Sequence, residues 1–180
     1  MCVNHCCLAH DVRMPQGEQP LNVLSAGCFG DGQHDETKAL QAAISSARTV
    51  FIPFGIYMVS APIILRPDSR IVGEGYSILR MMPNSFKTNQ ALLTAPPGSS
   101  SDDGVALADL SLWNADCGNE AGLMLAWEAG PASSMHDVNM LISTTVTSTT
   151  KAQTPKAEID DHFHIDRYTW TQPLGPQIVT

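Results

Sequence analysis

The chain has 180 residues, of which 43% are hydrophobic and only 16% are charged, and its formal net charge at pH 7 is -8. This length suffices for one domain with a sizeable core. The low charge, with many Ser, Thr, Gly and Pro residues, favours sheets and turns over a helical bundle. The negative charge argues against nucleic acid and anionic membrane surfaces as partners and leaves uncharged ligands open.

Residues 1–20 show no periodicity and end in PQGEQP, a phrase typical of a linker. They lack the continuous apolar stretch of an export signal, and no run of the chain approaches the ~20 apolar residues that cross a bilayer. The cysteines of the chain are odd in number, so they cannot all pair internally: Cys2, Cys6, Cys7, Cys28 and Cys117. Their spacing, with His5 and His10 nearby, matches no zinc-finger pattern, so we expect no metal there.

A short strand that runs into a glycine-rich turn is predicted in LNVLSAGCFGDG, where Gly30 and Gly32 permit the turn. Apolar residues then recur at helical spacing: Leu40, Ala43, Ile44 and Ala47. We therefore expect a helix from Thr37 to Ala47. Asp35 is its expected N-cap, whose carboxylate can accept hydrogen bonds from first-turn amides, and Glu36 adds charge that favours the helix dipole.

The same segment allows two other interpretations. Asp31, Asp35 and Glu36 could ligate calcium or magnesium, because hard cations prefer carboxylate oxygens, but helix capping explains these residues better. A phosphate-binding loop at Gly30 and Gly32 is disfavoured, since no Lys-Ser/Thr follows and Asp31 would repel the phosphate. We expect the segment to be structural, with no metal and no cofactor.

From residue 49 to residue 142 the sequence is a succession of short β-rich runs separated by turn signals. Val50, Ile71 and Leu92 lie in three of these runs and are 21 residues apart in both steps. Such a period predicts a solenoid in which each turn of the chain stacks on the previous one and these residues lie above one another. The amphipathic helix before the first run would cover the open end of the stack.

The C-terminal part differs in composition, because residues 143–158 are rich in Ser and Thr and poor in apolar residues, as linkers are. His162, His164 and Asp166 alternate and could ligate a metal, but a solvated segment is the better interpretation in so polar a tail. The predicted divisions of the chain are a linker-like N-terminus (1–20), a repetitive domain (21–142), and a linker with an irregular tail (143–180).

Four motifs follow one another between residues 26 and 79. They are Gly30-Asp31-Gly32, Asp35-Glu36-Thr37, Pro53-Phe54-Gly55-Ile56-Tyr57 and Gly73-Glu74-Gly75. In this order they resemble the opening of the pectate-lyase-like right-handed β-helix domains. The resemblance implies that residues 21–142 form an incomplete all-β solenoid, a single-stranded right-handed parallel β-helix with an N-terminal capping α-helix. Its structural motif residues would be Gly30, Asp31, Gly32, Asp35, Pro53, Gly55, Tyr57, Gly73 and Gly75.

Within that superfamily, residues 103–142 look most like the second β-helix of fungal exo-β-1,3-glucanases, which are built of two such helices side by side. The resemblance implies inverting hydrolysis of β-1,3-glucan outside the cell, without a cofactor, and a companion β-helix that this chain does not contain. Some residues depart from the family's pattern. Cys28 replaces a usual Ala, Phe54 replaces a small residue, His136 stands where Trp is frequent, and Ala126 replaces an acidic residue. These changes bear on catalysis more than on the fold.

Glycoside hydrolysis normally uses two carboxylates, one to protonate the leaving oxygen and one to activate water. The candidates are Asp109, Asp116, Glu120 and Glu128. Glu128 is the best catalytic candidate because the ring of Trp127 can stack on a sugar, although an exposed turn carboxylate is the more ordinary explanation. Trp127 and Trp113 are candidate substrate-binding residues or core residues. The asparagines that could form structural amide stacks, as in this fold, are Asn114, Asn119 and Asn139.

Three functions follow from these features. The first is a fragment of a polysaccharide-active glycoside hydrolase similar to a glucan 1,3-β-glucosidase. By itself this fragment could be active or inactive. The second is a non-catalytic carbohydrate-binding or structural β-helix, as in tailspike-like adhesins. The third is a degenerate gene fragment without activity. In the first two the expected partner is a polysaccharide, with β-glucan first.

Overall fold

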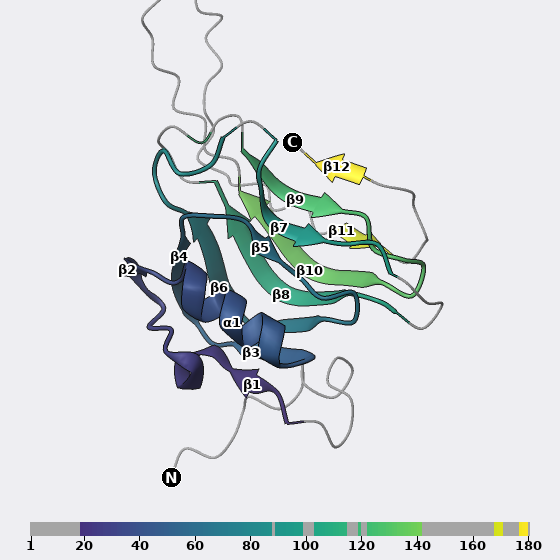
Figure 1. The fold of residues 1–180 in the computed structure, drawn as a ribbon, viewed down its shortest axis with the longest axis horizontal. Helices are drawn as coiled ribbons and strands as arrows, with labels where there is room; N and C mark the ends of the chain where they lie inside the picture. Colours follow the sequence, from purple (N-terminus) through teal and green to yellow (C-terminus); the bar gives the residue numbers. More distant parts are fainter. Residues whose placement is uncertain are drawn as a thin grey trace, which may run out of the picture.

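Figure 1 shows the fold in a computed structural model, which describes residues 19–87, 89–98, 103–114, 119 and 122–141, and the backbone of 168–170 and 177–179. These residues are mostly β-strand, the strands pair largely in parallel, and they include one α-helix. The all-β class with parallel sheets and a helix, predicted from the sequence, is confirmed. Among these residues no helix is long and apolar enough to span a membrane.

The elements of the N-terminal half are β1 (Leu21–Asn22), the 3₁₀ helix η1 (Val23–Ala26), β2 (Asp31–Asp35), α1 (Thr37–Ser46), β3 (Thr49–Ile52), β4 (Gly55–Val59), β5 (Ile63–Ile64) and β6 (Arg70–Met81). The later elements are β7 (Ala91–Ala95), β8 (Ala106–Trp113), β9 (Leu123–Trp127), β10 (Ser134–Leu141), β11 (Tyr168–Trp170) and β12 (Gln177–Val179).

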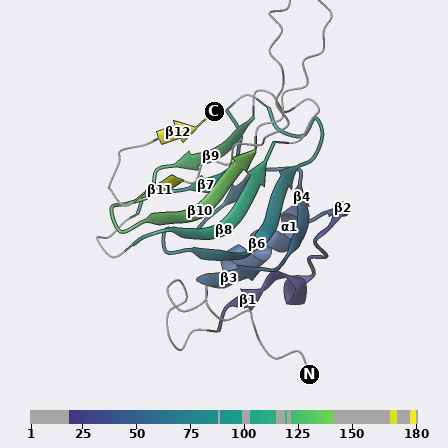
Figure 2. The same ribbon diagram turned by 180° about the vertical axis from the view of Figure 1, so that it is seen from behind.

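The strands form two sheets that lie one in front of the other (Figures 1 and 2). The large sheet has the order β1-β3-β6-β8-β10-β11, with β4 also paired to β6 and β2 paired to β4. The small sheet has the order β12-β9-β7-β5. From β5 to β10 the chain alternates between the two sheets, so each strand of one sheet leads into a strand of the other.

Neighbouring strands of the large sheet share one register. Val50 pairs with Ile71, Ile71 pairs with Leu107, and Leu107 pairs with Met135. Val50, Ile71 and Leu107 are almost completely buried, so the row supplies part of the core between the sheets. Because side chains at paired positions of parallel strands point the same way, the shared register keeps apolar residues facing inward in strand after strand. The predicted alignment of Val50 with Ile71 is confirmed.

The predicted place of Leu92 in this row is wrong. Leu92 lies in β7 of the small sheet, whose neighbours are β5 and β9, and Leu107 occupies the position beside Ile71. The step from Ile71 to Leu107 is 36 residues, because the chain visits the small sheet and makes two long connections in between. The residue 21 positions after Ile71 is therefore in the small sheet, where Leu92 is still fully buried.

The helix contributes its predicted apolar stripe to the core, with Leu40, Ala43 and Ile44 buried. Its N-cap is Glu36 and not Asp35, and it ends at Ser46, one residue earlier than expected. The Glu36 carboxylate, buried at 2% exposure, turns back and accepts hydrogen bonds from the backbone N–H groups of the two residues at 29 and 30. The first-turn amide of Thr37 donates to Asp35 instead, at 3.0 Å. Asp35 therefore accepts the first-turn amide of the helix, and Glu36 accepts the amides of the preceding turn.

α1 lies beside β5, at the edge of the small sheet (Figure 1). The amide side chain of Gln41 accepts a hydrogen bond from the backbone N–H of Ile64 at 2.9 Å and donates one to the Ile64 carbonyl at 3.0 Å. These two bonds repeat the pattern that a neighbouring strand would make. They satisfy backbone groups that an edge strand otherwise leaves unpaired.

Replacing Gln41 with Ala should therefore lower the free energy of unfolding by about 1–2 kcal/mol, the net worth of two hydrogen bonds. Lys38→Ala, an exposed change on the same helix, is the matched control and should change it by less than about 0.5 kcal/mol. Urea unfolding followed by circular dichroism measures both. Equal effects of the two substitutions would contradict a role for Gln41 at the sheet edge.

Candidate functional site

Strands β6, β8 and β10 depart from regular pairing at the same level of the large sheet. Val72 and Ser77 of β6 pair with Ala108 and Leu110 of β8, so four residues of β6 lie opposite the single residue Asp109. In β10, Asp137 lies between two residues that pair with the neighbours of Asp109. We call residues 73–76, 109 and 137 the bend column. It brings three acidic residues, one from each strand, to one place on the sheet: Glu74, Asp109 and Asp137.

Asp109 and Asp137 have the same unusual backbone conformation, with φ of 56° and 50°. Asp tolerates this left-handed region better than most residues, and single non-glycine residues that adopt it are concentrated in turns and functional sites. Asp109 also makes the bend compact, because a Cβ atom at Gly73 would lie 2.1 Å from the Asp109 carbonyl oxygen. Glycine at 73, one of the predicted motif residues, is what lets β6 and β8 approach here.

A buried hydroxyl fixes the β6 side of the column. Ser77 is fully buried, and its Oγ donates to the backbone carbonyl of Ile52 at 2.6 Å while also lying 3.0 Å from the Pro53 carbonyl. The same Oγ accepts the N–H of Glu74 at 2.8 Å. The Glu74 carboxylate accepts the N–H of Phe54 at 3.0 Å. Hydrogen bonds therefore fix both the backbone and the side chain of Glu74.

The Gly-Asp-Gly and Pro-x-Gly-x-Tyr motifs pack against each other next to the column. Gly30 and Gly55 have positive φ of 67° and 154°, and a Cβ atom at Gly55 would lie 2.6 Å from the Gly30 carbonyl oxygen. The ring of Tyr57 is fully buried against Gly30, and its hydroxyl donates to the Pro53 carbonyl at 3.1 Å. Gly32 and Gly75 also have positive φ, of 73° and 88°. The Gly-Asp-Gly and Pro-x-Gly-x-Tyr motifs thus form one packed turn pair.

The acids of the first turn hold the backbone. Asp31 accepts the N–H groups of Gln33 and His34, which lower its pKa, and its carboxylate lies 2.7 Å from His34 Nδ1. Burial alone would raise the pKa of Asp35, but hydrogen bonds from Ser60 and Thr37 outweigh it and lower that pKa. In the part of the chain that the structure describes, no group of three or more His, Cys, Asp or Glu residues could hold a metal ion.

The strand spacing sets how far apart the backbones of the bend column lie. Neighbouring strands lie about 4.8 Å apart, so the backbones at 109 and 137 are one such step apart and those at 74 and 137 about two steps. Glycosidases place their two carboxyl groups roughly 5–10 Å apart, depending on whether they retain or invert. His136 Nδ1 lies 2.8 Å from the Asp137 carboxylate.

The sequence-predicted site residues do not all come together. Trp127 ends β9 in the small sheet, partly buried against the core, and exposed Glu128 follows it and donates its N–H to the Ala95 carbonyl at 2.9 Å. Trp113 ends β8 in the large sheet, and the guanidinium of Arg80 lies 4.2 Å from the centre of its ring. Trp127 and Glu128 are thus adjacent, and Trp113 is on the other layer. Glu128 stays a prediction.

Other predicted candidates lie outside the described residues. They are Asp116, Glu120, Cys2, Cys6, Cys7, Cys117, His162, His164 and Asp166. Of the asparagines considered, Asn114 and Asn119 are buried, and Asn119 links separate segments. Its Oδ1 accepts the N–H of Phe86, and its Nδ2 donates to the carbonyls of Met82 and Asn114.

Sequence reasoning missed Glu74 and Asp137 as partners of Asp109. A signal was present, because Ala108-Asp109-Leu110 and His136-Asp137-Val138 both place Asp before an apolar strand residue, 28 residues apart. That repetition becomes meaningful only when the register of β8 and β10 is known. No motif in the sequence marks the four-residue bend of β6 as lying opposite a single residue of β8.

A family model described as "Rhamnogalacturonase A/epimerase, pectate lyase-like" matches residues 21–153, which is more than half of the chain. The chain therefore belongs to this pectate-lyase-like family, and the resemblance to the superfamily predicted from the sequence is confirmed.

The chain also matches individual proteins. Non-secreted LysM effector LysM19 of Penicillium expansum is 26% identical over 116 residues, which is 62% of this chain. Glucan 1,3-beta-glucosidase of Cochliobolus carbonum is 36% identical over 70 residues, which is 37% of this chain. The matched part spans 9% of the length of each of these relatives. Among solved structures, bacteriophage phi29 gene product 12 gives a TM-score of 0.46 at 24% identity, over 68% of this chain and 17% of that one.

One thiol lies beside the site. Cys28 is free and buried, and burial, followed by the charge of the Glu36 carboxylate, raises the pKa of its thiol from 9.0 to about 12. The folded state thus retains this proton at pH values where the unfolded chain loses it. The stability that this contributes is present below pH 9 and is lost as the pH rises through the interval from 9 to about 12.

We therefore expect the free energy of unfolding to fall more steeply above pH 9 in the native sequence than in Cys28→Ala. Burial, followed by the charge of Cys28, raises the pKa of Tyr57 to about 12, so Tyr57 titrates in the same interval and its coupling to Cys28 is part of the difference between the two proteins. Urea titrations at pH 8, 9 and 10 provide the comparison. Parallel pH profiles for the two proteins would show that Cys28 is not protected from ionisation.

Proposed function

We propose that the two sheets are two faces of a right-handed parallel β-helix, in which each coil adds one strand to each face, with α1 covering its N-terminal end. Support comes from the shared register of the large sheet, from the alternation of the chain between the sheets, and from the bonds of Gln41 to the edge of β5. The β-helix is incomplete in this account, and further coils or a companion β-helix complete the functional protein.

We infer that the chain is part of a polysaccharide-active glycoside hydrolase whose substrate is a β-1,3-glucan. The observation that carries this proposal is the bend column, in which Asp109 and Asp137 lie side by side on neighbouring strands with Glu74 on the next. The family to which the chain belongs and its match to a glucan 1,3-beta-glucosidase add support. As the resemblance implies, the protein would act outside the cell without a cofactor.

In this proposal Asp137, beside His136, is the base that removes a proton from the attacking water. Glu74 or Asp109 is the acid that donates a proton to the glycosidic oxygen as its bond to the anomeric carbon breaks. Attack from the opposite face inverts the anomeric carbon. Glu74 is two strands from Asp137, and this larger separation suits inversion, because a water molecule must fit between the base and the sugar.

Glu128, with Trp127 beside it, is the alternative catalytic candidate, and Trp127 and Trp113 are the alternative sugar-binding rings. Trp127 and Glu128 lie at the end of β9 in the other sheet, whereas Trp113 ends β8, the strand that carries Asp109. Glu128 and Glu74 are both exposed, so either would need a further segment of the protein to exclude water from it.

A non-catalytic carbohydrate-binding β-helix is the second candidate function. The observation that favours it is the exposure of aromatic side chains next to the bend column, because exposed rings bind sugars without any need for an acid and a base. Under this alternative the chain binds a polysaccharide and does not cleave it.

The test is release of glucose from laminarin by the full chain and its variants. Asp137→Asn should lower kcat by about 10²-fold or more, since it removes the base, while Glu128→Gln and the control Asp68→Asn, at a half-buried carboxylate paired with Arg66, leave it unchanged. Loss of turnover in Glu128→Gln, with Asp137→Asn still active, would show that the catalytic site is at the end of β9 and not at the bend column. Binding without turnover would favour the second function, and neither binding nor turnover would contradict both.

A further inference from the structure

Three strongly exposed aromatic side chains lie in the bend column or in the turns beside it. Phe29 is 64% exposed, Phe54 is 71% and Tyr76 is 73%, whereas most large apolar residues of the described chain are in the core. The other exposed large apolar residues, Leu24 and Ile64, are aliphatic and less exposed than the three rings. Exposed rings that occur together indicate a binding surface, because isolated apolar residues are ordinary and a contiguous set is not.

The three rings come from adjacent turns, in two pairs of ring contacts. Phe54 and Tyr76 are in edge contact, with ring centres 6.4 Å apart. Phe29 stacks on the imidazole of His34, with ring centres 4.7 Å apart, and the carbonyl of the next residue, Gly30, accepts the N–H of Ile56. The turns that carry Phe29 and Phe54 are therefore bonded to each other. We call Phe29, His34, Phe54 and Tyr76 the aromatic strip.

The backbone under the strip is fixed. The N–H of Phe29 donates to the buried Glu36 carboxylate at 2.9 Å, and the N–H of Phe54 donates to Glu74 at 3.0 Å. Tyr76 directly precedes the fully buried Ser77. A ligand on these rings would not have to order the loops that carry them, so little conformational entropy opposes its binding.

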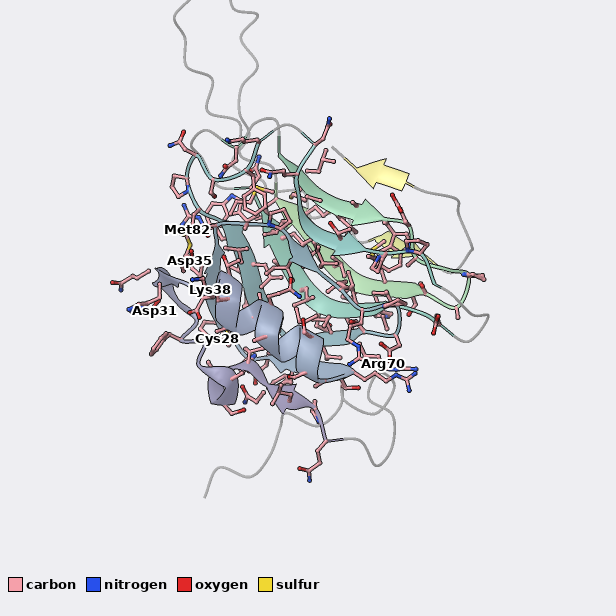
Figure 3. All side chains as sticks on the ribbon, in the orientation of Figure 1. Cys28, Asp31, Asp35, Lys38, Arg70 and Met82 are labelled. Atoms are coloured by element: carbon pink, nitrogen blue, oxygen red, sulfur yellow. The ribbon has the colours of Figure 1, made fainter. Side chains whose placement is uncertain are left out.

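The charges around the strip select the ligand. Asp31 and Glu74 border it, and the chain carries a net charge of -8, so a polyanionic glycan would be repelled. Figure 3 shows Asp31 and Cys28 on the β2 side of the molecule and Arg70 at the opposite end of the fold. A neutral sugar presents C–H groups to an aromatic face and hydroxyl groups to carboxylates, which is what the strip and its border offer.

We propose that the aromatic strip is the binding platform for a neutral β-glucan chain, which it guides toward the bend column. The inference rests on the proposed function and goes beyond it in assigning the binding surface and the charge class of the ligand. Glu74 joins the two parts, since its carboxylate holds the backbone of Phe54 while its own backbone belongs to the bend column. Phe54, which replaces a small residue in the resembled family, makes the platform a feature of this chain.

Binding of the full chain to laminarin and to polygalacturonate, measured by affinity electrophoresis, tests the proposal. Phe54→Ala and Tyr76→Ala should each weaken laminarin binding about twofold to tenfold, the range expected for loss of one stacked ring. Phe54→Tyr and Tyr76→Phe keep the ring and should retain the affinity. Ile64→Ala, which removes an exposed apolar side chain away from the strip, is the matched control.

Each outcome decides something. Unchanged laminarin affinity in both alanine variants would show that the aromatic strip does not bind the glucan, and it would leave the proposed function intact. Absence of any polysaccharide binding by the native chain overturns both. Stronger binding of polygalacturonate than of laminarin would contradict the claim that the ligand is uncharged. If the alanine variants change the sedimentation of the chain and not its glucan binding, the strip is a contact between copies. Unfolding curves of each variant separate lost binding from lost fold.

Discussion

The in-register parallel pairing of β3, β6, β8 and β10 is the constraint on which the rest of the structure depends. It keeps Val50, Ile71 and Leu107 on the inner face of successive strands, where they form core with the small sheet. The same pairing places Glu74, Asp109 and Asp137 at one level of the sheet. A shift of one residue in any of these strands would turn the apolar side chains outward, so the core enforces the alignment of the acids.

The site residues are consequences of this register and not of a local motif. Gly73 permits the approach of β6 to β8, Ser77 ties the bend to the turn at Pro53, and Glu74 holds Phe54. The acids and the exposed rings thus share hydrogen bonds with the same few turns. A buried polar network of this kind fixes the position of groups at the surface, because each member has little freedom to move alone.

Local features of the fold could be predicted from the sequence, and long-range ones only in part. The helix stripe, the glycine turns and the alignment of Val50 with Ile71 follow from short patterns whose physical cause is local. A fixed period places Leu92 in the wrong sheet, because the connections between strands vary in length. The N-cap was misassigned by one residue because the turn at Phe29 and Gly30 uses the Glu36 carboxylate, a contact that sequence spacing does not reveal.

The candidate site could be predicted even less well. Asp109 was among the carboxylates considered, but its neighbours Glu74 and Asp137 lie 35 residues before it and 28 after it. Only the pairing of strands makes them neighbours. Trp127 and Glu128 are adjacent in the chain and were therefore easy to associate, whereas the exposure of Phe54 and Tyr76 depends on a turn geometry that their sequence context does not specify.

Backbone NOEs between strands in the isotopically labelled protein test the register most directly, and a chain of 19.4 kDa is well suited to the measurement. The account predicts that Val72 contacts Ala108 and that Ala108 contacts His136, with β6, β8 and β10 as neighbours. Contacts that join β6 to the strand containing Leu92, in place of β8, would contradict it and would separate the three acids.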